Sequence, residues 1–275
     1  VEAPPQPVGQ PMVILSATTR ITVQETKLAV DSRVNEVRVT EGSARVERLG
    51  GGVAVGVPTG GWTRVGEEGQ LQAWEFADGV NLGGTQVLVD GRAWVSHDEA
   101  VKKGLKAEVG GKGEPAKKTE DAVVQPDGDF VRLPGLRKML MSKVSVSNEK
   151  LSVKWPLENG LYQVFVWMME DGGDKVRSLR LNVQGTPVAE ELGEKQTLRA
   201  WNRFGPYRAE VKDGSLDLLF SPESDFEKKE PHLAGIAVYR RAGTGASAKP
   251  EAEKGGGVPE GNDSLPPAVQ PTVPD

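Results

Sequence analysis

The chain has 275 residues, 37% of them hydrophobic, and a net charge of −5. This mild negative charge argues against nucleic-acid binding, which normally needs a basic face. The absence of cysteine excludes a disulfide scaffold, a thiolate metal site and a cysteine nucleophile. His97 and His232 are the only histidines, so the chain has very few residues from which a catalytic triad or a multi-histidine metal centre could be built.

The chain begins at Val1 rather than Met, which fits a fragment of a longer protein. It shows no secretory-signal pattern and no apolar run near the roughly 20 residues that cross a bilayer. We therefore expect no membrane-spanning segment in this sequence, and any segment for export or anchoring to lie outside it.

The first region alternates apolar and polar residues. Residues 1–11 are proline-rich and are interpreted as the end of a linker. Residues 12–72 show short alternating segments that predict a small β unit with strands of about five residues. Turns are expected where glycine interrupts the pattern, at Glu41-Gly42-Ser43 and at residues 50–52.

The second region, residues 73–241, has the pattern of an antiparallel sandwich. Asp90-Gly91 is a hairpin-type turn signal, and the mixed charges of residues 102–121 predict a solvated loop. Leu161–Met169 is apolar at nearly every position, which predicts a strand buried on both faces. Short alternating strands follow at regular spacing, and no amphipathic helix is expected.

The last region, residues 242–275, has almost no large apolar residue and is rich in proline and glycine. Such a segment cannot bury enough surface to offset its ordering entropy, so we predict a disordered tail. At the other end of the second region, Trp74, Glu75 and Phe76 are too apolar for a free linker. We therefore expect the first two regions to pack together.

Several pieces of the second region resemble malectin-like domains. They follow the family order over more than half of the chain: Val80–Gly84 with Val89–Trp94, Gly160–Glu170, Leu179–Gly185, Gly205–Tyr207, Asp213–Leu216 and His232–Tyr239. The resemblance implies a galactose-binding-like jelly roll. Such domains bind sugars through loops at one end or on a concave face, with aromatic platforms and carboxylates, and some carry a structural calcium ion. The expected fold is therefore an all-β, antiparallel jelly-roll β-sandwich beside a smaller N-terminal β unit.

The first region is similar to the β part of FecR-like proteins. Glu36–Val46 fits the Glu-Gly-x-(Ala/Val)-x-Val hairpin of that family, and Gly66–Gln70 fits its later Gly-Gln turn. The resemblance implies an extracytoplasmic segment, periplasmic or at the cell surface, of a bacterial membrane-associated sensor or surface protein.

Two tryptophans are candidate sugar platforms, because sugar binding needs flat apolar faces beside hydrogen-bonding groups. Trp94 lies where the resemblance places a ligand aromatic, just before His97 and Asp98, which we include in the candidate site. The alternative for Trp94 is ordinary packing. Trp201 lies in a polar segment, where a platform and a rim-packing role are both open. Arg137 falls in another binding loop of the family, or is a surface residue that aids solubility.

The segment Glu170–Asp174 places three carboxylates within five residues, those of Glu170, Asp171 and Asp174. They could bind calcium through oxygen, or accept hydrogen bonds from sugar hydroxyls. The alternative is a solvated hairpin turn. Malectin itself has adjacent aromatic residues after the acidic residue, so this segment departs from it. His232 is interpreted as a structural residue.

These observations favour a carbohydrate-binding, non-catalytic module of a bacterial cell-surface or periplasmic protein, with a glycan or other cell-surface ligand as partner. No catalytic signature surrounds any Asp or Glu, so we expect no enzyme activity. One alternative is a structural or signalling ectodomain of a FecR-like membrane-associated regulator with no sugar site. Another is the accessory region of a hydrolase. The oligomeric state and the identity of the ligand stay open.

Overall fold

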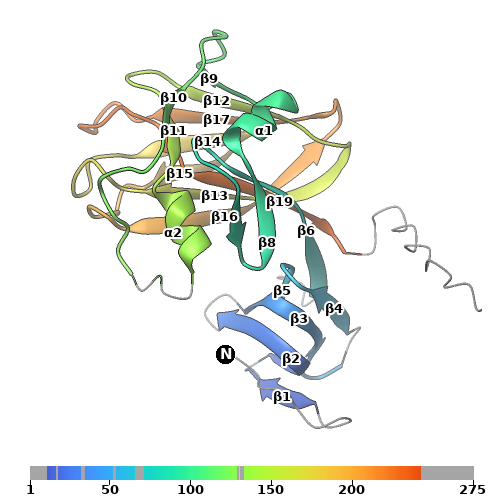
Figure 1. Ribbon diagram of the computed structural model, residues 1–275. Helices are drawn as coiled ribbons and strands as arrows, with labels where there is room; N and C mark the ends of the chain where they lie inside the picture. The colour runs from blue at the N-terminus through green and yellow to red at the C-terminus, as the bar shows by residue number, and fades with distance from the viewer. Residues whose placement is uncertain are drawn as a thin grey trace, which may run out of the picture. The chain divides into compact units, whose positions relative to one another are not determined.

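The computed structural model describes residues 11–16, 18–31, 35–51, 54–65, 71–128, 130 and 133–242. The Gly66–Gln70 turn, residues 1–10 of the expected linker and residues 243–275 of the expected tail lie outside the described residues. The described chain is an all-β sandwich of mainly antiparallel sheets with two short helices (Figure 1), which confirms the predicted fold class.

The N-terminal strands are antiparallel neighbours in one sheet. They are β1 (Met12–Leu15), β2 (Thr19–Asp31), β3 (Glu36–Arg48), β4 (Val55–Pro58) and β5 (Trp62–Val65). The order is β1-β2-β3-β5, and β4 pairs with another part of β3. Alternation places Ile21, Val23, Val39 and Val46 in one apolar core, as the sequence pattern predicts.

Strands β2 and β3 are each 13 residues long, and the turn expected at Glu41-Gly42-Ser43 is not formed. Gly42 lies inside β3 with φ 76°. The β2–β3 register shifts between Gln24 and Lys27, opposite this position. Glycine therefore serves a bulge here rather than a chain reversal, because it adopts positive φ without steric cost.

Strand β6 (Leu71–Asn81) belongs to both halves of the described chain. Its first residues pair with β5, where Trp62 faces Trp74, and its length from Trp74 to Asn81 pairs with β19 (Gly235–Arg241). The expected boundary between residues 72 and 73 falls inside this strand, and the division into domains stays a prediction. Trp74 stacks on Trp62 with ring centroids 6.1 Å apart, which confirms that this stretch is not a free linker.

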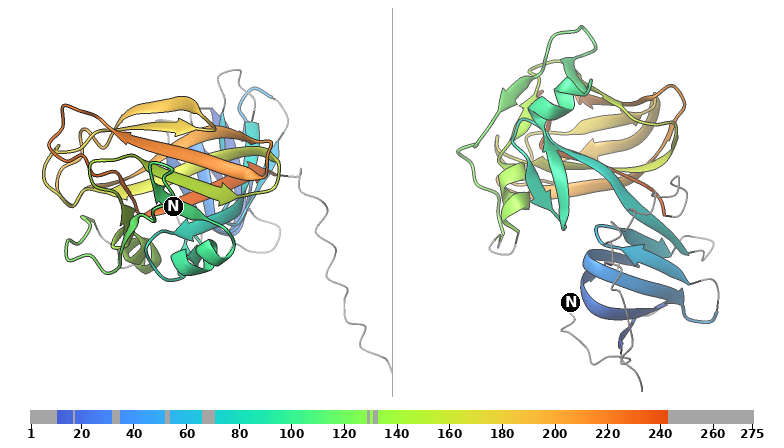
Figure 2. Two further views of the ribbon diagram at one scale, coloured as in Figure 1. Left: turned by 90° about the horizontal axis from the view of Figure 1, so that it is seen from above. Right: turned by 45° about the vertical axis from the view of Figure 1, so that its right-hand side comes forward.

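Two layers form the sandwich, and they can be followed in the turned views of Figure 2. One layer continues from β6 through β19 and β13 (Gly160–Met169) to the edge strand β16 (Trp201–Val211), with β7 (Val87–Val89) and β8 (Arg92–Ser96) beside β6. The facing sheet has the order β15 (Thr186–Leu192), β14 (Leu179–Val183), β17 (Ser215–Pro222), β12 (Leu151–Pro156) and β9 (Lys106–Val109). A third sheet contains β10 (Lys117–Thr119), β11 (Lys143–Ser145) and β18 (His232–Leu233).

Strand β13 is buried on both faces, as its apolar run predicts. Val164, Val166 and Met168 enter the core between the two layers. Phe165 and Trp167 point the other way, into an aromatic cluster that β7, β8 and α2 (Pro134–Leu140) cover. A strand with a core on each side has no polar face, which explains why the sequence does not alternate there.

Four elements differ from the sequence expectation, two short helices and two strands. Helix α1 (His97–Lys102) and helix α2 have six and seven residues, too short for a helical period to stand out. Ser96 caps α1, its hydroxyl accepting from the Glu99 N–H at 3.2 Å. Residues 102–121 are not one loop, because β9 pairs with β12 and β10 with β11.

None of the described helices is long and apolar enough to cross a membrane.

A buried carboxylate lies where the N-terminal strands meet the sandwich. Glu36 on β3 is 3% exposed and accepts hydrogen bonds from Arg38 at 2.8 Å, Arg64 at 2.9 Å and Arg203 at 2.7 Å. Arg203 comes from β16, and its guanidinium lies 4.2 Å from the centroid of the Phe165 ring. Burial opposes ionisation, but Arg203 and Arg38 outweigh it and lower the pKa of Glu36 to about 2. We call these four polar residues the Glu36 cluster.

Candidate functional site

Trp94 has no open face for a ligand. Its side chain is 1% exposed. It stacks on Phe76 at a centroid distance of 6.2 Å and meets Trp167 edge-on at 5.0 Å. A side chain at Gly79 would come within 2.7 Å of the indole. The packing alternative therefore describes Trp94 in this structure.

His97 and Asp98 begin helix α1 and do not meet the other predicted residues in a common pocket. The Asp98 carboxylate accepts a hydrogen bond from Lys118 at 3.0 Å, and this bond lowers its pKa. Half-burial, followed by the charge of Lys118, lowers the pKa of His97. Arg137 is exposed on α2, where its guanidinium donates to the side chain of Gln125.

Trp201 begins β16 and is fixed at the rim of the aromatic cluster. Its indole N–H donates to the backbone carbonyl of Asp127 at 3.0 Å. Its ring lies 5.9 Å from that of Phe130. Trp201 is half-buried. These contacts agree with the rim-packing role, and the role as a sugar platform stays a prediction.

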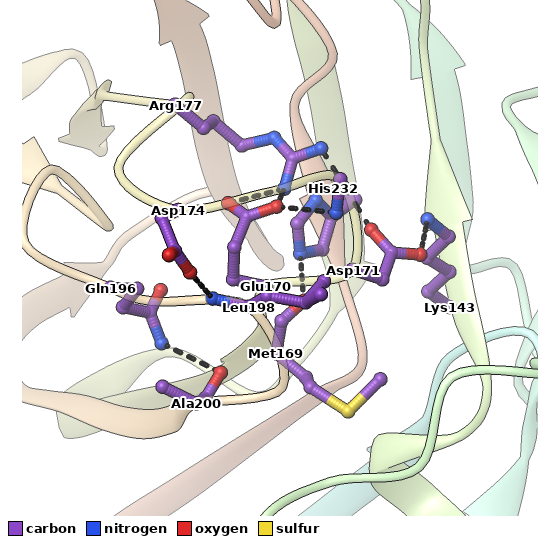
Figure 3. A network of polar contacts seen from close by, with 11 residues as sticks. Lys143, Met169, Glu170, Asp171, Asp174, Arg177, Gln196, Leu198, Ala200 and His232 are labelled. Atoms are coloured by element: carbon purple, nitrogen blue, oxygen red, sulfur yellow. Dashed lines mark hydrogen bonds and ion pairs between the residues drawn. The ribbon is translucent and has the colours of Figure 1, made fainter.

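The predicted acidic segment follows β13, and its first carboxylate is locked in an internal ion pair (Figure 3). Glu170 is 1% exposed, and both of its oxygens lie 2.8 Å from Nη1 of Arg177, which is equally buried. The Gly172 N–H also donates to Glu170 at 2.7 Å. Burial raises the pKa of Glu170 above its usual value, although Arg177 opposes that effect.

The second carboxylate, Asp171, is neutralised by cations from other elements. It accepts from the ammonium of Lys143 on β11, and one oxygen lies 3.9 Å from Nη2 of Arg177. Burial opposes its ionisation, but the hydrogen bond from Lys143 helps to hold the pKa of Asp171 below its usual range. Neither Glu170 nor Asp171 could therefore bind a ligand without breaking an existing contact.

His232 on β18 completes this network as a neutral side chain. It is 1% exposed, and Nε2 donates to the carbonyl of Met169 at 2.8 Å. Burial, with Arg177 and Lys143 close by, lowers the pKa of His232 well below its usual value. The imidazole thus packs against the ion pairs without adding a charge to them.

Asp174 fastens the acidic segment to the connection between β15 and β16. Its carboxylate accepts from the backbone N–H of Leu198 at 2.7 Å. The segment is thus an anchored connection with buried ion pairs, not the solvated hairpin of the alternative. No group of three or more His, Asp or Glu side chains in the described ranges is arranged to hold a metal ion. The sequence did not reveal Lys143 as a partner, because it lies 28 residues from Asp171 along the chain. Arg177 follows Glu170 by only seven residues, but residue order alone does not show that the chain folds back to pair them.

An open groove lies elsewhere, between the edge strands β15 and β16 of the two layers. Its volume is about 850 Å³. It is lined by Val183, Gln184, Thr186, Val188, Pro206, Tyr207, Arg208, Glu210, Lys212, Asp213 and Asp217. We call this the edge groove. None of the site residues predicted from the sequence lines it, because an edge position depends on strand order, which a single sequence does not give.

Tyr207 is the aromatic residue of the edge groove. Its half-buried ring packs against the core between the layers. Burial raises the pKa of Tyr207 to about 12. The phenol therefore stays protonated at neutral pH, and no group in the described part of the chain bonds to its hydroxyl. Pro206 and Val188 provide apolar surface in the same groove.

The amide of Gln184 is rigidly held at the end of the groove. Its Oε1 accepts from the Asp217 N–H at 2.7 Å, and its Nε2 donates to the Ser215 carbonyl at 3.0 Å. The edge groove thus joins fixed polar groups, an aromatic ring and apolar surface, a combination typical of small-ligand sites.

No family model matches this chain, and no curated protein matches it. Among solved structures, it is similar to the plant receptor-like kinase ANX2, with 13% identity, a TM-score of 0.47, and coverage of 64% of this chain and 52% of that chain. The ANX1 ectodomain from Arabidopsis thaliana gives 12% identity, a TM-score of 0.49, and coverage of 68% and 56%.

A third solved structure contains the plant peptide RALF23 in complex with FER and LLG2. It matches with 12% identity, a TM-score of 0.49, and coverage of 82% of this chain and 73% of that chain. The chain spans about half the length of the first of these structures. Likeness of this size does not establish a family, so the malectin-like and FecR-like assignments stay predictions.

Proposed function

We propose that this chain is a non-catalytic carbohydrate-binding module and that the edge groove holds the sugar. The observation that carries the proposal is the lining of the groove, where the half-buried Tyr207 lies with polar and charged side chains. Sugars present C–H faces that pack on aromatic rings and hydroxyls that need both donors and acceptors. The groove volume of about 850 Å³ lies within the range of small-ligand sites.

The carboxylates of the groove support binding rather than hydrolysis. A glycosidase of the common type needs one carboxylic acid with a raised pKa, opposite a second carboxylate. Within the described ranges, a raised pKa belongs to the carboxyls of Asp78 and Glu170, and neither lines the groove. Glu210 is paired with Lys212 at 3.3 Å.

The proposed location is outside the cytoplasm, at the surface or in the periplasm of a bacterium. Support comes from the sequence resemblance of the first region to FecR-like proteins and of the second to malectin-like domains. A glycan of the cell envelope or of the surroundings is the partner that such a location offers.

A glycan array followed by calorimetric titration tests the proposed function. We expect the wild-type chain to bind a subset of glycans. Tyr207→Ala should weaken binding at least tenfold, because the ring contact is lost, whereas Tyr207→Phe keeps the ring and should lose less. Arg45→Ala, on an exposed face of β3, is the control and should bind as the wild type does.

Absence of binding to any glycan on a broad array would overturn the proposal. If Tyr207→Ala leaves glycan binding unchanged, the sugar does not bind in the edge groove. Thermal unfolding of each variant shows whether a loss of binding reflects a loss of fold.

A second candidate is an interaction scaffold with no sugar site. The Glu36 cluster favours it, because Arg203 of the sandwich and Glu36 of the N-terminal strands are joined at 2.7 Å through a buried contact. A buried contact of this kind suits a domain that transmits a movement between the N-terminal strands and the sandwich, rather than one that only binds a ligand. A negative array together with specific protein binding would favour this candidate.

A further inference from the structure

Lys143 and Asp171 form the least exposed lysine ion pair in the described part of the chain. Their side chains are 15% and 16% exposed. In the other lysine pairs that the structure describes, the lysine is at least 32% exposed and its partner at least 41%. The Lys143 ammonium donates directly to Asp171. An amine and a carboxyl group are thus held in contact, away from most of the solvent.

Two fixed elements present these groups to each other. Lys143 is the first residue of β11, where it pairs with Thr119, and a Cβ at Gly83 would collide with its backbone. Asp171 lies two residues beyond the end of β13, the doubly buried strand. Groups oriented in this way react as if each met the other at an effective concentration of about 10⁵ M or more.

Arg177 lies beside the other oxygen of the Asp171 carboxylate. Lys143 contacts Oδ2 of Asp171, whereas Nη2 of Arg177 is 3.9 Å from Oδ1. Both oxygens of Glu170 hold Nη1 of the same guanidinium at 2.8 Å (Figure 3). Attack on a carboxyl carbon moves negative charge onto an oxygen, and a fixed cation beside that oxygen stabilises the charge. Glu170 therefore positions Arg177 to stabilise an attack on Asp171.

The backbone nitrogen that follows Asp171 is engaged elsewhere. An Asp-Gly sequence can close into a ring, because no side chain hinders attack of the glycine nitrogen on the aspartate carboxyl. Here the Gly172 N–H donates to Oε1 of Glu170 at 2.7 Å. The amine of Lys143 is therefore the nucleophile that the structure presents to Asp171.

We propose that Lys143 and Asp171 condense to an isopeptide bond that joins β11 to the end of β13. The ammonium first passes a proton to Oδ2, which gives a neutral amine and a carboxylic acid. The amine nitrogen attacks Cγ of Asp171, and the negative charge on Oδ1 faces Arg177. The bond between Cγ and Oδ2 then breaks, and Oδ2 leaves as water with a second proton from the nitrogen. One ammonium and one carboxylate thus yield one amide and one water, with no further reactant.

The ion pair is the resting state of the two groups. Burial opposes ionisation of Asp171, but the hydrogen bond from Lys143 helps to hold the pKa of Asp171 below its usual range. The neutral pair is therefore rare, and condensation is slow compared with folding. The amide removes two mostly buried charges whose desolvation is unfavourable, so the product accumulates with time.

The cross-link does not involve the edge groove, so it stands apart from the proposed function. The chain has no cysteine and hence no disulfide. An amide between residues 28 positions apart closes a loop in the unfolded chain, as a disulfide does.

Mass spectrometry of the full chain tests the proposal. During incubation at neutral pH, we expect a species lighter by one water to increase until the mass no longer changes. Trypsin should then release residues 139–150 joined to residues 155–175, because an amide on Lys143 blocks cleavage after it. Tandem mass spectrometry of the joined peptides locates the bond at Lys143 and Asp171.

Two variants with the same change of side chain are the controls. Lys143→Arg keeps the positive charge beside Asp171 but has no amine, so its mass should stay at the full value. Lys154→Arg makes this change in an exposed pair with Asp217, and it should lose water as the wild type does. Circular dichroism confirms that each variant is folded.

Two outcomes would overturn the isopeptide bond. One is a folded wild type that keeps its full mass throughout the incubation. The other is a loss of water that persists in Lys143→Arg, because that loss would come from a ring closed by the nitrogen of Gly172. Identification of the joined peptides in the wild type supports the bond even if Lys143→Arg does not fold.

Discussion

The pair of Glu170 and Arg177 shows how a residue that looks like a ligand group can be a structural one. Three carboxylates within five residues suggested a cation or sugar site, yet Glu170 and Arg177 are each only 1% exposed and bind each other at 2.8 Å. Removing one partner of such a pair leaves a buried charge without compensation. At the scale of single residues, substitutions in the acidic segment should therefore change the stability of the protein rather than ligand binding.

Arg177→Met should reduce the free energy of unfolding by about 3 to 5 kcal/mol, because Glu170 then loses its buried partner. Equilibrium denaturation in urea measures the change. The control is Arg180→Met, which removes an ion pair with Glu223 from an arginine side chain that is 62% exposed. That pair should contribute at most about 1 kcal/mol. Equal losses for the two variants would contradict the internal role of the Glu170 pair.

At the scale of elements, helix α2 depends on a close approach that only glycine permits. A Cβ at Gly135 would lie 1.9 Å from the backbone oxygen of Leu88, next to the cluster that α2 covers. The helix also begins without a side-chain cap. Contact with β7 is therefore what positions α2, rather than local sequence.

Gly135→Ala should push α2 away from β7 and destabilise the protein by about 1 to 3 kcal/mol, as overpacking does. Thermal unfolding monitored by tryptophan fluorescence is the measurement. Gly160→Ala is the control, because a Cβ there meets nothing closer than 3.6 Å. If both variants melt together with the wild type, the close approach at Gly135 is not a determinant of stability.

The elements also show what a sequence can and cannot specify. The apolar run of β13 predicted a doubly buried strand, because two cores demand apolar residues on both faces. Helices α1 and α2 escaped prediction, since six or seven residues do not complete enough turns to show a period. Gly42 predicted a turn, but tertiary pairing of β2 and β3 used its positive φ for a bulge.

The candidate site was less predictable than the fold. Nothing local distinguishes Trp94, which is buried, from a tryptophan that faces a ligand. Tyr207 was visible only as the end of the Gly205–Tyr207 piece that resembles malectin-like domains. Its proposed role depends on β16 being the last strand of its layer, and strand order is a long-range property that one sequence does not encode locally.

At the scale of the whole molecule, the Glu36 cluster links stability to pH. The pKa of Glu36 is lowered from 4.5 to about 2 by the arginines around it, against the effect of burial. A carboxyl whose pKa is lower in the folded state stabilises the protein above the unfolded pKa. That contribution is lost as the pH falls from about 4.5 through 2.

Comparison of the wild type with Glu36→Gln should reveal this dependence. We expect the free energy of unfolding of the wild type to fall by about 3 kcal/mol more than that of the variant between pH 6 and pH 2. Urea denaturation at a series of pH values measures both curves. Parallel curves would contradict ionic stabilisation by Glu36.

Strand β6 has a consequence for how the protein can be divided. The strand pairs with β5 on one side and with β19 on the other. A cut between residues 72 and 73 would remove β5, so the start of β6, which still pairs with β19, would become an unprotected strand edge. Exposed strand edges recruit other chains, so a fragment that begins at Ala73 should self-associate. The described chain should instead lose its N-terminal strands and its sandwich in a single cooperative melting step.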